Sequence, residues 1–110
     1  QEANLLPNVS EKVNTQELQN NNEVYCYNGK PYTGISIDLF ENKTKQQEIN
    51  WKDGLLHGLK TEYFPGGRVI RTTMNFYEGK RNGYFVYYHE NTKVKLEGKY
   101  LFDQLDSTIN

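Results

Sequence analysis

A repeat of 24–25 residues runs through most of the chain and strongly limits the folds that it can adopt. Glycines recur in pairs at this interval: Gly29 and Gly34, Gly54 and Gly58, Gly79 and Gly83. Aromatic residues recur at the same interval: Trp51, Phe76 and Tyr100. Because a fixed period of this length is typical of repeat proteins, whose units stack on their neighbours, we expect a long stack of similar units.

Each repeat has the residue pattern of a β-hairpin. Apolar and polar residues alternate after the second glycine of each pair, in residues 34–40, 58–64 and 83–89. Turn-type clusters end these runs, at residues 41–44, 65–68 and 90–93. Alternation with a period of two predicts strands, and Gly or Asn supplies the positive φ of tight turns. The sequence therefore predicts an all-β fold, an elongated antiparallel meander of about seven strands with an exposed edge near residues 94–102.

The alternation also assigns side chains to the two faces of the predicted sheet. One face receives the apolar residues of the outgoing and returning strands: Ile35, Ile37, Leu39, Ile49, Trp51, Leu59, Thr61, Tyr63, Met74, Phe76, Tyr84, Val86, Tyr88, Leu96 and Tyr100. Cys26 shares the column of Trp51, Phe76 and Tyr100 and is expected to be a small core residue. The other face is polar in the first two repeats, where it carries Ser36, Asp38, Lys60 and Glu62.

Residues 1–23 form a lead-in segment that differs in composition from the repeat domain at 24–110. Residues 1–22 contain no glycine and no aromatic residue, and nine of these 22 positions are Asn or Gln. Leu6, Val9 and Val13 recur at helical spacing. A short helix over about residues 10–18 and an extended segment are therefore both open for this part of the chain.

Charge and composition exclude several classes of function. The chain has 13 basic and 14 acidic residues, which argues against a nucleic-acid interface. No apolar run approaches the roughly 18 residues that a membrane span needs. One cysteine, Cys26, and two isolated histidines, His57 and His89, lack the clustering of a metal site. No nucleophile motif or phosphate-binding loop is present, so we expect no catalytic, cofactor or metal site and no enzyme activity.

The third repeat and the end of the second carry a family resemblance. The segments Tyr63–Arg68 and Asn75–Tyr88 together resemble the MORN repeat in its bacterial variant form. Three copies, the last incomplete, cover about residues 24–104. The sequence departs from the pattern at Lys43 and Thr92, which replace the glycine of the usual Asn-Gly turn. It departs again at Asp103 and Ser107, which stand where a fourth glycine pair would fall.

The resemblance implies protein binding without catalysis. The leading expectation is an exported or envelope-associated accessory subunit of a larger protein assembly, in the periplasm or at the cell surface, with a cytoplasmic location as the alternative. A second expectation is an immunity or antitoxin protein that neutralises a toxin by direct binding. A third is peripheral contact with membrane phospholipid, as in eukaryotic relatives. The chain starts at Gln1, which a removed targeting segment and an arbitrary boundary explain equally well.

The third repeat is expected to be apolar on both faces. Phe85 and Tyr87 occupy the columns that are polar in the other repeats, and Tyr77 and Leu101 are placed on the same side across the meander. An exposed aromatic patch is typical of a contact site, so these four are the predicted partner-binding residues. Strand addition at the exposed edge is a further expectation. Alternatively, the lead-in segment covers the patch through its apolar residues, Leu5, Leu6, Val9 and Val13.

Overall fold

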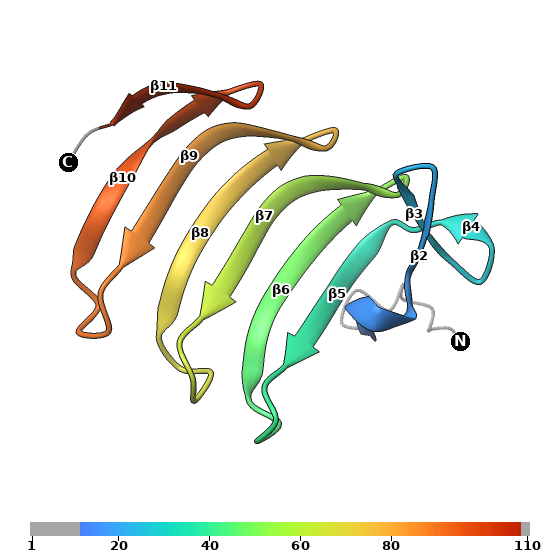
Figure 1. The fold of residues 1–110 in the computed structure, drawn as a ribbon, viewed down its shortest axis with the longest axis horizontal. Helices are drawn as coiled ribbons and strands as arrows, with labels where there is room; N and C mark the ends of the chain where they lie inside the picture. Colours follow the sequence, from blue (N-terminus) through green and yellow to red (C-terminus); the bar gives the residue numbers. More distant parts are fainter. Residues whose placement is uncertain (1–11, 109–110) are drawn as a thin grey trace, which may run out of the picture.

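The structure, a computed structural model, describes residues 12–108. These residues form eleven β-strands and one short 3₁₀ helix, η1 (Figure 1). The elements are β1 (Lys12–Asn14), η1 (Thr15–Glu17), β2 (Gln19–Asn21), β3 (Val24–Tyr27), β4 (Lys30–Pro31), β5 (Gly34–Leu39), β6 (Lys45–Lys52), β7 (Leu55–Tyr63), β8 (Ile70–Tyr77), β9 (Lys80–Tyr88), β10 (Val94–Leu101) and β11 (Gln104–Thr108).

The predicted all-β meander is confirmed. Strands β5 to β11 follow one another as an antiparallel meander of seven strands. Strand β1 extends it to eight strands by pairing in parallel with β5, whereas β2, β3 and β4 form a separate small sheet. The strand β3, with Cys26, therefore does not join the column of Trp51. Within the described part of the lead-in, residues 12–23 form two strands and η1 rather than an α-helix.

The predicted position of the exposed edge was wrong. Strand β10 lies between β9 and β11, so residues 94–101 are an interior strand and β11 is the edge. The sequence hides the last hairpin because its turn, Phe102-Asp103, has no glycine. Both turn residues nevertheless have positive φ, +46° and +70°.

The hairpin turns explain why the first glycine of each pair recurs. Asp53 and Gly54 have φ of +50° and +84°, and Glu78 and Gly79 have +47° and +90°. Two successive residues with positive φ form the two-residue turn that matches the twist of paired strands, and glycine adopts this conformation without strain. Asp103 takes the glycine position in the last hairpin.

In the second and third pairs, the second glycine lies at a β-bulge. Between Ile49 and Trp51, strand β7 has two more residues than β6, and Gly58, with φ of +96°, lies within this excess. Strand β9 has the same excess beside β8, around Gly83. At each bulge an asparagine side chain donates a hydrogen bond to a backbone carbonyl oxygen of the next strand, Asn50 to Leu59 at 2.7 Å and Asn75 to Tyr84 at 2.9 Å.

The register contradicts part of the predicted face assignment. Ile49 lies opposite Ser36 and Lys60, and Met74 lies opposite Lys60 and Phe85. Directly opposite residues share a face of the sheet. The apolar residues of the returning strands therefore lie on this face, the Phe85 face, and not with Leu59 and the other residues of the opposite Tyr84 face. Alternation within one strand cannot reveal how that strand is aligned with its neighbour.

The core lies at the end of the sheet where β1 pairs with β5. Leu18, Ile49 and Trp51 form its buried centre. Ser36, with 0% of its surface exposed, accepts hydrogen bonds from the indole Nε1–H of Trp51 and from the hydroxyl of Thr15, each at 2.8 Å. A buried serine is tolerated because its oxygen is paired. This pairing ties η1 to the sheet.

The loops that connect β5 to β6, β7 to β8 and β9 to β10 lie at the opposite ends of the strands from the two-residue turns. Their equivalent residues allow backbone strain to be tested. Lys43, Gly67 and Thr92 occupy equivalent positions with φ of +73°, +71° and +74°, and each N–H bonds the carbonyl three residues earlier. A β-branched residue is strained in this conformation.

Replacing Thr92 with glycine is therefore expected to stabilise the protein by about 1 kcal/mol and to raise its Tm by about 4–8 °C. Thermal unfolding followed by circular dichroism measures this change. Thr92→Ala is the matched control, because alanine removes the branched side chain but still disfavours positive φ. A Tm for Thr92→Gly at or below that of the unmodified chain would contradict the assigned strain.

Candidate functional site

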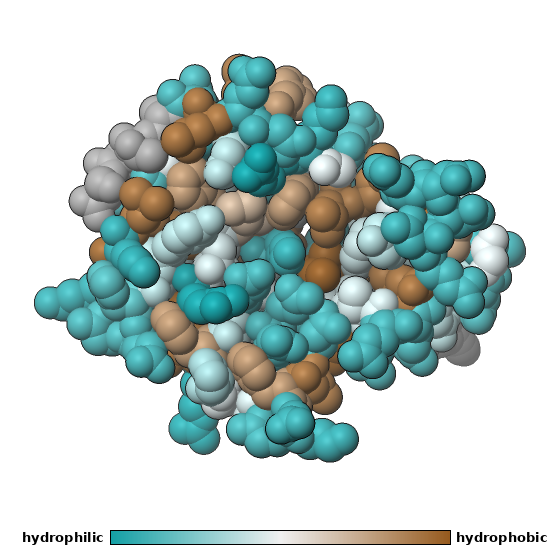
Figure 2. Space-filling view, in the orientation of Figure 1, coloured by the Kyte–Doolittle hydropathy of each residue, from teal (hydrophilic) through white to brown (hydrophobic). Residues whose placement is uncertain are grey.

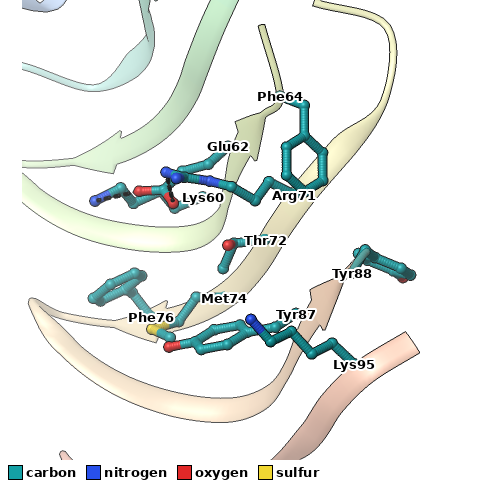
Figure 3. A pocket seen from close by; sticks show the side chains of 10 residues that line it. All are labelled: Lys60, Glu62, Phe64, Arg71, Thr72, Met74, Phe76, Tyr87, Tyr88 and Lys95. Atoms are coloured by element: carbon teal, nitrogen blue, oxygen red, sulfur yellow. Dashed lines mark hydrogen bonds and ion pairs between the residues drawn. The ribbon is translucent and has the colours of Figure 1, made fainter. Parts of the chain in front are cut away.

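An open groove of about 500 Å³ lies on the Phe85 face, across strands β7 to β10. Its lining residues are Lys60, Glu62, Phe64, Arg71, Thr72, Met74, Phe76, Tyr87, Tyr88 and Lys95 (Figure 3). Strand alternation brings Lys60, Met74 and Phe76 to one face, and the register aligns Glu62, Thr72 and Tyr87 in the next row. The groove is therefore lined by residues from two repeats.

The groove divides into a charged side and an apolar side. On the charged side, the Arg71 guanidinium bonds the Glu62 carboxylate at 3.0 Å, and Lys60 Nζ lies 3.9 Å from the same group. On the apolar side, Met74, Phe76 and Tyr87 gather below these charges, and Lys95 extends beside Tyr87 (Figure 3). Figure 2 shows small apolar areas enclosed by hydrophilic side chains on the face that it draws.

Phe85 supports the groove from below instead of contacting solvent. It is 3% exposed, and its ring lies 5.6 Å from the ring of Tyr87 and 4.9 Å from that of Tyr100. The Arg81 guanidinium lies 4.4 Å from the centre of the Tyr100 ring. The prediction of Phe85 as a contact residue is therefore replaced by a packing role that holds Tyr87 in place.

Tyr77 and Leu101 do not join Phe85 and Tyr87. Tyr77 directly follows Phe76, and Leu101 directly follows Tyr100. Because Phe76 and Tyr100 lie on the Phe85 face, alternation places Tyr77 and Leu101 on the Tyr84 face. Both side chains are exposed there. Of the four predicted residues, only Tyr87 lines the groove. The sequence alone does not place Met74, Phe76 and Arg71 in the groove, because alternation within one strand does not show how that strand is aligned with its neighbours.

The lead-in does not cover the third repeat in the part of the chain that the structure describes. Val13 lies in β1, which pairs with β5, and its side chain packs against the cluster around Trp51. Leu5, Leu6 and Val9 lie outside the described residues.

His57 and Cys26 both make contacts within the fold. The Nδ1 atom of His57 accepts a hydrogen bond from the backbone N–H of Glu78 at 3.1 Å, and its ring lies 5.0 Å from the ring of Tyr77. Cys26 is buried in β3, with its sulfur 3.8 Å from the carbonyl oxygen of Val24. In residues 12–108, no three His, Cys, Asp or Glu side chains gather in an arrangement that could hold a metal ion.

Comparison with known proteins gives no match to a family model, to a curated protein or to a solved structure. Among the described residues, none of the helices has the length and apolar character needed to span a membrane.

Proposed function

We propose that this protein is a non-catalytic protein-binding module, an accessory subunit of a larger assembly, and that the groove on the Phe85 face is its contact site. The observation that carries the proposal is the combination of apolar side chains from Met74, Phe76 and Tyr87 with an open volume of about 500 Å³. Aromatic residues and Met are enriched at the centres of protein interfaces. The resemblance to MORN repeats supports binding, and the proposed export to the periplasm or cell surface rests on that resemblance.

The charges of the groove suggest the chemistry of the partner. The lining contains three cations, Lys60, Arg71 and Lys95, and one carboxylate, Glu62, which leaves a net charge of +2 (3 − 1). Complementary charge guides the approach of a partner and fixes its orientation. The segment that fits is an extended acidic peptide with one large apolar side chain, which would occupy the space beside Met74 and Tyr87.

Selection of peptides from a random displayed library tests this proposal. We expect the purified chain to enrich peptides that combine Asp or Glu with an aromatic or Leu residue. Tyr87→Ala should weaken their binding at least about 30-fold, as removal of a central aromatic contact does. Dissociation constants measured by calorimetry give the comparison.

Tyr84→Ala is the matched control, because Tyr84 is 57% exposed on the opposite face of the same strand. It should leave the dissociation constant unchanged. Selected peptides without acidic residues, or equal losses in the two variants, would contradict the assigned groove. Circular dichroism spectra of both variants establish that the fold is retained.

A further inference from the structure

The turn of each hairpin in the meander forms two hydrogen bonds with the unit that precedes it in the chain. This pair of bonds repeats from one unit to the next. The second turn residue of each hairpin donates its backbone N–H to a carbonyl oxygen of the preceding unit: Gly54 to Tyr32 at 2.8 Å, Gly79 to Leu56 at 2.7 Å and Asp103 to Arg81 at 2.8 Å. The tips of the three long hairpins follow one another along one side of the sheet (Figure 1). Each unit thus offers an acceptor to the unit that comes after it.

A second bond accompanies each of these contacts. The first turn residue donates its N–H to a side chain of the preceding unit: Asp53 to Thr33 at 2.9 Å, Glu78 to His57 at 3.1 Å and Phe102 to Asn82 at 3.1 Å. The three acceptors differ in chemistry but all stand directly before the residue at the second glycine position. A turn therefore docks on two consecutive residues of the preceding unit. The first residue supplies a backbone carbonyl oxygen, and the second supplies a side-chain acceptor.

The last hairpin has residues at the positions that correspond to this pair of acceptors, at the edge of the sheet. In the two preceding hairpins the acceptors lie two and three residues after the second turn residue, so the corresponding positions after Asp103 are Leu105 and Asp106. The pairing of Tyr100 with Leu105 matches that of Phe76 with Arg81. Strand β11 is the last of the sheet in the described residues, and no following hairpin lies there to use these groups.

The two ends of the stack differ in character. The outer strand of the small sheet, β2, consists of exposed polar residues, Gln19–Asn21, which suit a terminal unit that faces water. The last hairpin instead exposes large apolar side chains: Leu101 at 52%, Phe102 at 53% and Leu105 at 56%. Asp103 is held in place, because the backbone N–H and the guanidinium of Arg81 donate to its carboxylate and lower its pKa. The tip of this hairpin is thus ordered and uncovered.

We infer that the β11 end is a docking site for a β-hairpin of a partner protein. The hairpin continues the internal stacking interface: its first strand pairs with β11, and its two-residue turn donates two N–H groups to the Leu105 carbonyl and the Asp106 carboxylate. Glycine is the favoured second turn residue of the partner, because it adopts positive φ without strain. This site is separate from the groove and does not depend on the function proposed for it.

A cyclised peptide with the sequence of residues 70–88 is the probe, because this hairpin docks in the same way inside the chain. Cyclisation holds the peptide as a hairpin before it binds. Titration of the ¹⁵N-labelled full chain should give saturable amide shifts at residues 101–108, with a dissociation constant below about 1 mM. Asp106→Ala should weaken binding at least threefold, whereas Asp106→Asn, which copies Asn82, should retain it.

The control probe replaces the residue equivalent to Gly79 with valine, and it should not bind. Absence of shifts with the glycine probe, shifts confined to the groove around Tyr87, or equal binding of the Asp106→Ala and Asp106→Asn chains would overturn the inference. The other possible occupant of this edge is a second copy of the chain. Sedimentation of the unliganded chain detects it. Self-association that places the edge of β11 against a second copy would also overturn it.

Discussion

Replacing Trp51 with alanine is expected to lower the free energy of unfolding by about 3–5 kcal/mol, the usual range for removal of a large buried aromatic side chain. Trp51 lies in the buried centre of the core, where the Tyr25 ring packs against it at a tilt of 40° with ring centres 5.0 Å apart. Stabilities of small domains are commonly about 5–15 kcal/mol, so this variant should lose a large part of its stability. Urea denaturation followed by fluorescence of the tyrosines and by circular dichroism measures the loss.

A pair of milder substitutions separates the hydrogen bond of Trp51 from its packing. Ser36→Ala leaves the buried indole N–H without its acceptor, for which we expect a loss of about 1–3 kcal/mol. In a Trp51→Phe background that N–H no longer exists, and Ser36→Ala should then have a smaller effect. Equal losses in both backgrounds would contradict the role given to the Ser36 hydroxyl.

Replacing Gly54 with alanine is the second change for which we expect a large effect. A Cβ atom at Gly54 would collide with Cγ1 of Val24 and would lie 2.9 Å from the carbonyl oxygen of Tyr25. The residue also has φ of +84°. Overpacking costs about 1–3 kcal/mol and positive φ about 1–2 kcal/mol, so the loss should reach about 2–5 kcal/mol.

Gly79→Ala provides a matched control for this prediction. Gly79 has nearly the same φ, +90°, but a Cβ there would meet only Leu55 atoms at 3.8–4.0 Å. Its loss should be limited to the conformational part, about 1–2 kcal/mol. Chemical denaturation of both variants gives the comparison. Equal losses would show that the small sheet containing Val24 does not press on the turn at Gly54.

The repeat period was sufficient to predict the fold class, the number of strands in the meander and most turns. This succeeded because positive φ at hairpin turns restricts the choice of residue, and Gly54 and Gly79 mark it directly in the sequence. The last hairpin escaped prediction because Phe102 and Asp103 adopt the same turn without glycine. Contacts with Arg81, 22 residues earlier in the chain, stabilise this turn, whereas local residue preference does not.

The candidate site was less predictable than the fold. Tyr87 could be selected from composition, because an aromatic stood where other repeats have charges. Its exposure relative to Phe85 could not be predicted, since it depends on how the rings of Phe85 and Tyr87 in β9 pack with the ring of Tyr100 in β10. The bulges around Gly58 and Gly83 shift the pairing of neighbouring strands. An excess of two residues leaves each side chain on its own face, so the faces depend on the pairing of the strands across each turn, where a misalignment of one residue moves every side chain of a strand to the other face.

The order of strands in the sheet has a consequence for how the protein folds. From β6 to β11 each strand pairs only with strands next to it in sequence, and the buried cluster of Trp51 lies at the β5 end. Short-range contacts favour rapid folding that spreads from one nucleus along a chain of similar units. The β5 end should therefore form first and open last, with β11 exchanging its amide hydrogens fastest. A bound hairpin would slow that exchange by giving the final strand a neighbour on each side.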